Sequence, residues 1–180
     1  MAKIIEIGSA KGGVAKTTTT YNLAYILKGM GYKVLAIDLD PQANLSTCFG
    51  VEDTTSVPVT IGHLLMNVID DQDMPETDKF VMSRNNVDYI PASMMLSAVE
   101  AKLRMEMGAE KMLSYVLEPL RERYDFILID TSPSLGALTI NAIAAADEVI
   151  VTVNPQLLAM MGLQDYLKTI TKIRNRINPN

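Results

Sequence analysis

The chain has 180 residues, enough for one domain with a sizeable core, and 48% of them are hydrophobic. No apolar run reaches the about 18 residues that a membrane-spanning helix needs, so the composition predicts a soluble globular protein. One cysteine, Cys48, excludes an intramolecular disulfide, and the absence of a visible signal peptide agrees with a cytoplasmic location. The formal charge of −5 means that any basic surface must be local.

Apolar strands alternate with helix-length segments, which is typical of a parallel sheet covered on both faces. Strands are predicted at residues 3–8, 34–38, 87–91, 126–130 and 148–153. Helices are predicted at residues 16–30, 61–69, 95–104, 110–123, 137–145 and 163–177. Residues 51–86 are polar and irregular, and are expected to form a solvated excursion with one short helix. The pattern predicts one α/β domain over residues 1–180, doubly wound, with a mostly parallel sheet.

Residues 9–18 read Ser-Ala-Lys-Gly-Gly-Val-Ala-Lys-Thr-Thr and stand between the first predicted strand and the first predicted helix. A glycine loop in that place points backbone N–H groups and the positive helix end at one spot, which is how proteins hold phosphate. The usual pattern G-x-x-x-x-G-K-[ST] is not met, because Ala10 and Ala15 replace both glycines. The pattern that is met is x-K-G-G-x-x-K-[ST]. The predicted nucleotide contacts in this loop are Lys11, Gly12, Gly13, Val14, Ala15, Lys16, Thr17 and Thr18.

Three later motifs follow predicted strands. They are Asp-Leu-Asp-Pro-Gln-Ala-Asn at residues 38–44, Phe-Ile-Leu-Ile-Asp-Thr-Ser-Pro-Ser-Leu at 126–135, and the segment 146–155, which ends in Asn154 and Pro155. In open parallel sheets, ligands bind beyond the carboxyl ends of the strands, so all three motifs are expected to meet the phosphate loop. Asn154 and Pro155 are accordingly predicted to contact the nucleotide.

Charge suggests the role of each residue. Lys16 is expected to hold the β- and γ-phosphates, and Thr17 to offer its hydroxyl to Mg²⁺. Asp130, after four apolar residues, is expected to be the Walker B carboxylate that holds a magnesium-bound water. Asp38 either supports the magnesium shell or is a structural carboxylate at a strand end.

The x-K-G-G-x-x-K-[ST] loop is the deviant Walker A loop of the ParA and MinD ATPases, and residues 40–44 and 132–136 resemble the ParA branch. The resemblance covers nearly all of the chain, which lacks the last third of the family. It implies a P-loop ATPase fold with ATP and Mg²⁺ as cofactors. It also implies that Asp40 orients the attacking water, and that Lys11 reaches the phosphates of the partner subunit in an ATP-dependent homodimer. Lys11, Lys16 and Asp40 are therefore the expected catalytic residues.

The same resemblance implies plasmid or chromosome partition, with slow Mg²⁺-dependent ATP hydrolysis stimulated by a ParB-like partner. It further implies non-specific DNA binding, association with the nucleoid and no membrane. The basic side of the last helix, at Lys168, Lys172, Arg174 and Arg176, either touches DNA phosphate or is a solvated helix face. Two alternatives stay open: a MinD-like membrane-cycling ATPase, which needs a C-terminal amphipathic helix, and a non-hydrolysing truncated assembly or binding fragment.

Ala15 departs from the family, since most relatives have glycine there. Glycine relieves backbone strain near the phosphate, and alanine accepts a positive φ less readily. We expect a tolerated loop with lower affinity or slower turnover.

Overall fold

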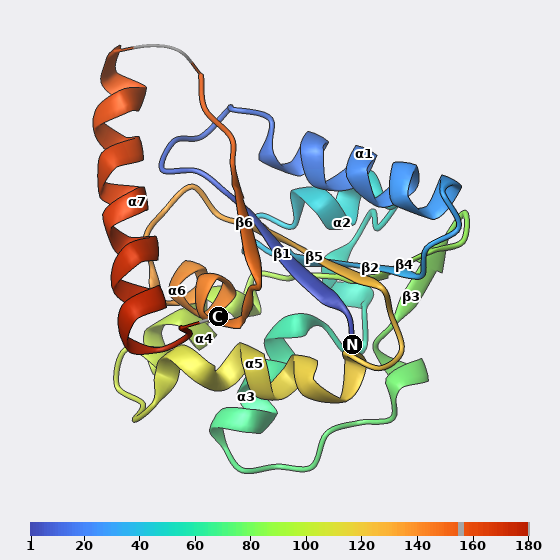
Figure 1. Cartoon of the computed structure of the whole chain (residues 1–180). Coiled ribbons are helices and arrows are strands. Elements are labelled where there is room, and N and C mark those ends of the chain that lie inside the picture. Colours follow the sequence, from blue (N-terminus) through green and yellow to red (C-terminus); the bar gives the residue numbers. More distant parts are fainter. Residues whose placement is uncertain (155–156, 180) are drawn as a thin grey trace.

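Six strands of the computed structural model form one sheet in the order β3-β4-β2-β5-β1-β6 (Figure 1). The structure describes residues 1–154 and 157–179, without the side chains of residues 157–161. The strands are β1 (Lys3–Gly8), β2 (Val34–Leu39), β3 (Met82–Arg84), β4 (Val87–Ile90), β5 (Phe126–Thr131) and β6 (Glu148–Val151). The α-helices are α1 (Lys16–Gly29), α2 (Asn44–Cys48), α3 (Ile61–Ile69), α4 (Met95–Leu103), α5 (Met112–Leu117), α6 (Ala137–Ala145) and α7 (Leu157–Arg176).

Helices cover both faces of the sheet, as Figure 1 shows. Side chains alternate along β1, so Ile5 and Ile7 join one apolar cluster with residues of α1 and α2. Ile4 belongs to the opposite cluster, which contains residues of α3, α4, α5 and α6. A third cluster joins α7 to α6 through Tyr166, Ile173 and Ile143. The two-sided burial explains why these strands are continuous apolar runs.

The sheet is parallel except at one edge, where β3 pairs antiparallel with β4. The strand β1 lies between β5 and β6, and β2 lies between β4 and β5, all in parallel register. The carboxyl ends of β1, β2 and β5 therefore meet at one edge, where Asp130 of β5 is in register with Ile7 of β1 and Asp38 of β2. The prediction of a doubly wound, mostly parallel sheet is confirmed.

Inside the region 44–86, α2, β3 and two 3-10 turns (Thr54–Ser56 and Thr77–Lys79) were not predicted. The helix α2 has only five residues, and all three residues of β3 are exposed, so neither carries an apolar pattern. The hairpin between β3 and β4 turns on Asn85 and Asn86, whose φ angles of 48° and 64° suit the two-residue turns that join antiparallel strands.

The predicted helix over 110–123 is wrong as a single element. It is broken into a 3-10 turn (Ala109–Lys111), α5 and a second 3-10 turn (Glu118–Leu120). Pro119 explains the second break, after Leu117, because proline lacks the N–H that would continue α5. In addition, β6 ends at Val151, two residues before its predicted end, and α7 begins at Leu157, before the predicted residue 163.

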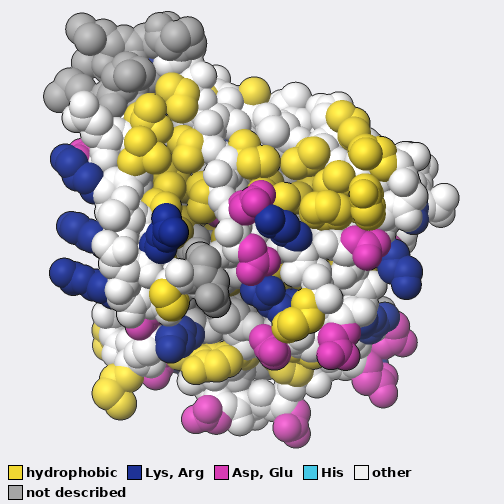
Figure 2. Space-filling view, in the orientation of Figure 1, with side chains coloured by type: hydrophobic (Ala, Val, Ile, Leu, Met, Phe, Trp, Pro, Cys, Tyr) yellow, Lys and Arg dark blue, Asp and Glu magenta, His cyan; other side chains and the backbone are white. Residues whose placement is uncertain are grey.

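Apolar side chains gather in two places on the face shown in Figure 2, one over α1 and one between α7 and β6. The α1 patch includes Ile26 and Met30, which are 59% and 66% exposed. Lys and Arg side chains follow the outer side of α7 (Figure 2). In the described part of the chain, no helix is both long and apolar enough to cross a bilayer.

Candidate nucleotide-binding site

The loop between β1 and α1 has the backbone geometry of an anion site. Gly13 and Ala15 both adopt the left-handed conformation, with φ angles of 71° and 64°. Ala15 is the N-cap of α1 and supplies no side-chain cap, so the first amides of this helix are left for an external acceptor. The positive φ at Ala15 is the conformation that makes alanine less suitable than glycine, at a cost of about 1 kcal/mol.

A cavity of about 590 Å³ opens over this loop, which we call the phosphate-loop pocket. It is bounded by the loop on one side and by the segments that follow β2 and β5 on the other. Its lining residues are Gly12, Gly13, Val14, Ala15, Lys16, Thr17, Thr18, Asp40, Gln42, Asn44, Thr131 and Pro133. The structure thus brings seven of the eight predicted loop residues together with Asp40.

Thr17 and Asp130 form a pair next to this pocket. The Thr17 hydroxyl donates to Oδ2 of Asp130 at 2.6 Å, and the Thr20 hydroxyl donates to Oδ1 at 3.3 Å. Burial raises the pKa of Asp130 to about 6, against the lowering effects of the Thr17 hydrogen bond and the Lys16 charge.

This donor set fits a magnesium ion. One hydroxyl and one carboxylate are what Mg²⁺ takes from protein when phosphates supply further ligands. Within residues 1–154 and 157–179, no group of three or more His, Cys, Asp or Glu side chains is placed to hold a metal ion by itself.

Lys16, the first residue of α1, is 7% exposed and faces the carboxylates of the site. Burial lowers the pKa of Lys16, while the charges of Asp130, Asp40 and Glu6 act to raise it. An ammonium group held among carboxylates in a recess is placed to attract a further anion such as phosphate.

The two aspartates after β2 differ in their surroundings. Oδ2 of Asp38 accepts from both the backbone N–H and the hydroxyl of Ser46, each at 2.7 Å, and Oδ1 accepts from the N–H of Asp40 at 3.2 Å. Burial raises the pKa of Asp38 to about 7. These bonds fix the orientation of the Asp38 carboxylate. Its place in the magnesium shell stays a prediction. Asp40 instead lines the phosphate-loop pocket, where it accepts from the N–H of Gln42 at 2.9 Å.

Lys11 and Asn154 lie beside the phosphate-loop pocket and do not line it. Both are exposed, and both line a small neighbouring hollow together with Leu163 of α7. Their roles stay predictions. Pro155 lies outside the described residues.

Five residues of the site were not singled out by sequence reasoning. Four of them line the pocket: Gln42, Asn44, Thr131 and Pro133. They belong to the motifs that follow β2 and β5, and this position in the sequence could have pointed to them. Glu6 is fully buried in β1, and its signal was a lone charge inside an apolar strand.

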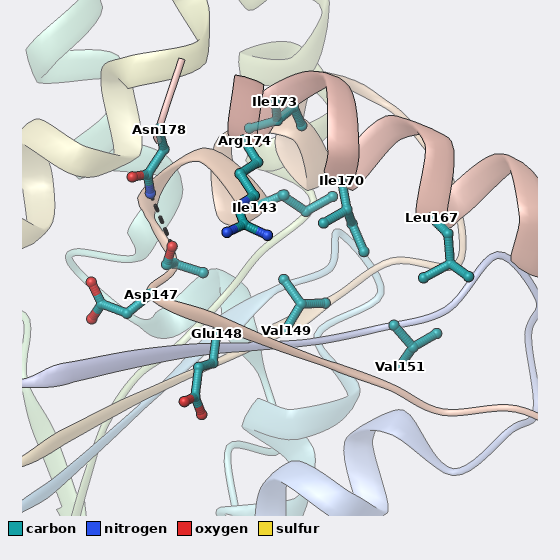
Figure 3. A pocket seen from close by; sticks show the side chains of 11 residues that line it. Ile143, Asp147, Glu148, Val149, Val151, Leu167, Ile170, Ile173, Arg174 and Asn178 are labelled. Atoms are coloured by element: carbon teal, nitrogen blue, oxygen red, sulfur yellow. Dashed lines mark hydrogen bonds between the residues drawn. The ribbon is translucent and has the colours of Figure 1, made fainter. Parts of the chain in front are cut away.

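A second cavity, of about 490 Å³, lies between β6 and α7 (Figure 3). Val149 and Val151 from β6 face Leu167 and Ile170 from α7 across it (Figure 3). No residue of the phosphate loop lines this cavity, so of these two cavities only the phosphate-loop pocket has the features of an anion site.

Comparison with known proteins agrees with the geometry. A family model described as an AAA domain matches residues 2–180. Soj of Bacillus subtilis, a sporulation initiation inhibitor protein, is 38% identical over 178 residues, which cover 99% of this chain and 68% of Soj. The chain belongs to the ParA/Soj family. The chromosome partitioning protein ParA of Caulobacter vibrioides is 38% identical over 180 residues, covering 98% of this chain and 65% of that protein.

Relatives in the ParA/Soj family can be considerably longer. An uncharacterized protein of Mycobacterium tuberculosis is 38% identical over 179 residues, and the chain spans 55% of its length.

Solved structures show the same fold. Cobyrinic acid a,c-diamide synthase from Mycobacterium smegmatis, solved with an ATP analog and magnesium, superposes with a TM-score of 0.90 at 34% identity, covering 99% of this chain and 71% of that one. A McdA–ATP complex from Cyanothece gives a TM-score of 0.83 at 30% identity, covering 97% of this chain and 65% of that one. The predicted P-loop fold of the ParA/Soj family is confirmed.

Proposed function

We propose that residues 1–180 form the ATPase domain of a partition protein that binds ATP with Mg²⁺ in the phosphate-loop pocket. The observation that carries the proposal is the convergence of Lys16, the Thr17–Asp130 pair and Asp40 on one pocket at the carboxyl edge of the sheet. The ATP analog and magnesium named with the Mycobacterium smegmatis structure support the same choice of ligand.

Each residue then has a task in phosphoryl transfer. Lys16 and the first amides of α1 hold the phosphates, and Thr17 and Asp130 would hold the metal. When bound there, Mg²⁺ would neutralise negative charge that develops on the phosphates in the transition state. Asp40 orients the attacking water, because it is the carboxylate that lines the pocket. Phosphoryl transfer requires the protein mainly to position the reacting groups and to stabilise charge. We expect turnover to be slow.

Lys11 acts in the partner subunit of an ATP-dependent homodimer. It is exposed and lies outside the lining of the phosphate-loop pocket of its own chain, which Lys16 already serves. A cation supplied across a dimer interface has the role of an arginine finger in other P-loop enzymes.

The dimer binds DNA non-specifically and is stimulated by a ParB-like partner, as the relationship to ParA and Soj suggests. The available basic side of α7, at Lys168, Lys172, Arg174 and Arg176, is exposed. Since Lys168 is paired with Asp165 at 3.1 Å and the chain carries a net charge of −5, DNA binding by these residues is weak and steeply salt-dependent.

Substitution of Lys11 and Asp40 tests the proposal. Lys11→Ala should bind ATP as a monomer and lose both ATP-dependent dimerisation, measured by light scattering, and hydrolysis. Asp40→Ala should bind ATP and lose hydrolysis. In a mixture of the two variants, one composite site keeps both residues if Lys11 acts in trans, so partial turnover should return.

Two results would contradict this scheme. If Lys11→Ala dimerises like the parent, Lys11 is an ordinary loop residue. If the parent binds ATP and never hydrolyses it, with or without a ParB-like protein, the chain is a non-hydrolysing binding fragment.

A further inference from the structure

Glu6 is a buried acid in β1, between β5 and β6, with 0% of its surface exposed. The hydroxyls of Tyr166 and Thr131 both donate to its Oε1, at 2.7 Å and 2.8 Å. The second oxygen, Oε2, is buried and has no hydrogen-bond partner among the described residues. A buried, incompletely bonded carboxyl group destabilises a fold, so packing alone does not account for this residue.

The backbone leaves room for this group next to the phosphate loop. Gly8 is the last residue of β1, and a Cβ added there would collide with the Tyr166 hydroxyl and with the Glu6 carboxyl. The side chain of Glu6 therefore extends along its strand to the root of the loop. One turn of α7 away from Tyr166, Gly162 lies against Ala10 of the loop, where an added Cβ would come within 3.1 Å of the Ala10 Cβ.

The carboxyl of Glu6 thus connects two parts of the molecule that are far apart in sequence. Thr131 lines the phosphate-loop pocket directly after Asp130. Tyr166 is fully buried in α7, in the cluster that fastens this helix to α6. The charge of Lys16, inside the pocket, also acts on Glu6.

We propose that Glu6 and Tyr166 are positioning residues that couple nucleotide binding in the phosphate-loop pocket to the stability of α7. A nucleotide that fills the pocket restrains Thr131 and the loop, and the hydrogen bonds through Glu6 pass this restraint to Tyr166. The amides of α7 then open less often. The inference rests on the nucleotide binding proposed above and needs neither dimerisation nor DNA.

Amide hydrogen exchange of the full chain, with and without ADP and Mg²⁺, tests the coupling. In the parent, ADP should slow exchange over residues 162–176 about tenfold, the factor that one hydrogen bond of about 1.4 kcal/mol supplies. Tyr166→Phe keeps the buried ring, removes only the hydroxyl, and should abolish this ADP-dependent slowing. Glu6→Gln keeps an oxygen that accepts both hydrogen bonds and should preserve it.

Tyr124→Phe is the matched control. Tyr124 is also a buried tyrosine whose hydroxyl donates to a carboxylate, that of Asp88 at 3.0 Å, and it does not line the phosphate-loop pocket. Its substitution should leave the response of α7 to ADP unchanged.

Calorimetric titration with ADP distinguishes a failure of the coupling to α7 from a failure of nucleotide binding. If the parent binds ADP and its α7 does not respond, or if Tyr166→Phe responds as the parent does, the coupling is refuted and nucleotide binding stands. If the parent binds ATP with Mg²⁺ and not ADP, the coupling to ADP is refuted and the proposed function stands; if it binds neither nucleotide, both fail.

Discussion

Replacement of Glu6 by glutamine should change the pH dependence of stability in a direction that the structure determines. Burial raises the pKa of Glu6 from 4.5 to about 7, although hydrogen bonds from Tyr166 and Thr131 and the charge of Lys16 lower it. The unfolded chain releases this proton near the ordinary value, whereas the folded protein keeps it until a higher pH. The contribution of Glu6 to the free energy of unfolding therefore decreases as the pH rises between these two values, and is constant below and above them.

The difference between 4.5 and about 7 corresponds to about 3 kcal/mol. Glutamine carries no titrating proton and lacks this penalty at high pH. The new amide N–H₂ takes the place of one carboxyl oxygen, and its own cost or gain is the same at every pH. We therefore compare the free energy of unfolding of Glu6→Gln with that of the parent at two pH values. The difference, variant minus parent, should be larger at about pH 8 than at about pH 5 by roughly 2–3 kcal/mol.

Urea unfolding at the two pH values, without nucleotide or Mg²⁺, measures this difference. Glu122→Gln, at an exposed position, supplies the effect of removing a surface glutamate. If the stability difference between Glu6→Gln and the parent is the same at both pH values, the folded protein does not hold a proton on Glu6, and the reasoning from burial is refuted.

Three further substitutions test the loop. Ala15→Gly should raise the free energy of unfolding by about 1 kcal/mol and tighten ADP binding, because glycine accepts the φ of 64° without strain. Urea unfolding and calorimetry measure the two effects. Lower stability or weaker binding would show that Ala15 is not strained. Lys16→Ala should lose most nucleotide affinity and keep the fold by circular dichroism, and parental affinity in calorimetry would remove Lys16 from the site. Thr17→Ala should retain nucleotide binding and lose the part that depends on Mg²⁺, since the hydroxyl next to Asp130 is gone; an unchanged response to Mg²⁺ would exclude Thr17 as a ligand.

Local patterns in the sequence were sufficient for the main elements of the fold. A buried parallel strand is a continuous apolar run, so β1 was found with its exact bounds, and periodic helices such as α3 and α6 were found as well. The phosphate loop is also local, because its atoms come from consecutive residues. The motifs at strand ends predicted a pocket at the carboxyl edge of the sheet, since parallel strands all end there.

Only the tertiary structure shows that Asp38 and Asp130 have different surroundings. Both aspartates end apolar strands, and the sheet places them in register. Asp38 is enclosed by Ser46 of α2, a short helix without a readable pattern, whereas Asp130 meets Thr17 across 113 positions of sequence. Which neighbour a strand-end carboxylate receives depends on how distant segments pack, and residue type does not encode that.

Glu6 shows most clearly which properties of a residue follow from the sequence and which follow from tertiary packing. Its place in the sequence determined that it would lie in a buried strand, with its side chain on the same face as that of Ile4. The hydroxyls that donate to its carboxyl group belong to Thr131 and Tyr166, which are 125 and 160 residues away. The alternation of side chains along a strand determines on which side of the sheet Glu6 lies. The groups that Glu6 contacts on that side depend on how α7 packs against β1, β6 and α6, and this packing exists only in the folded chain.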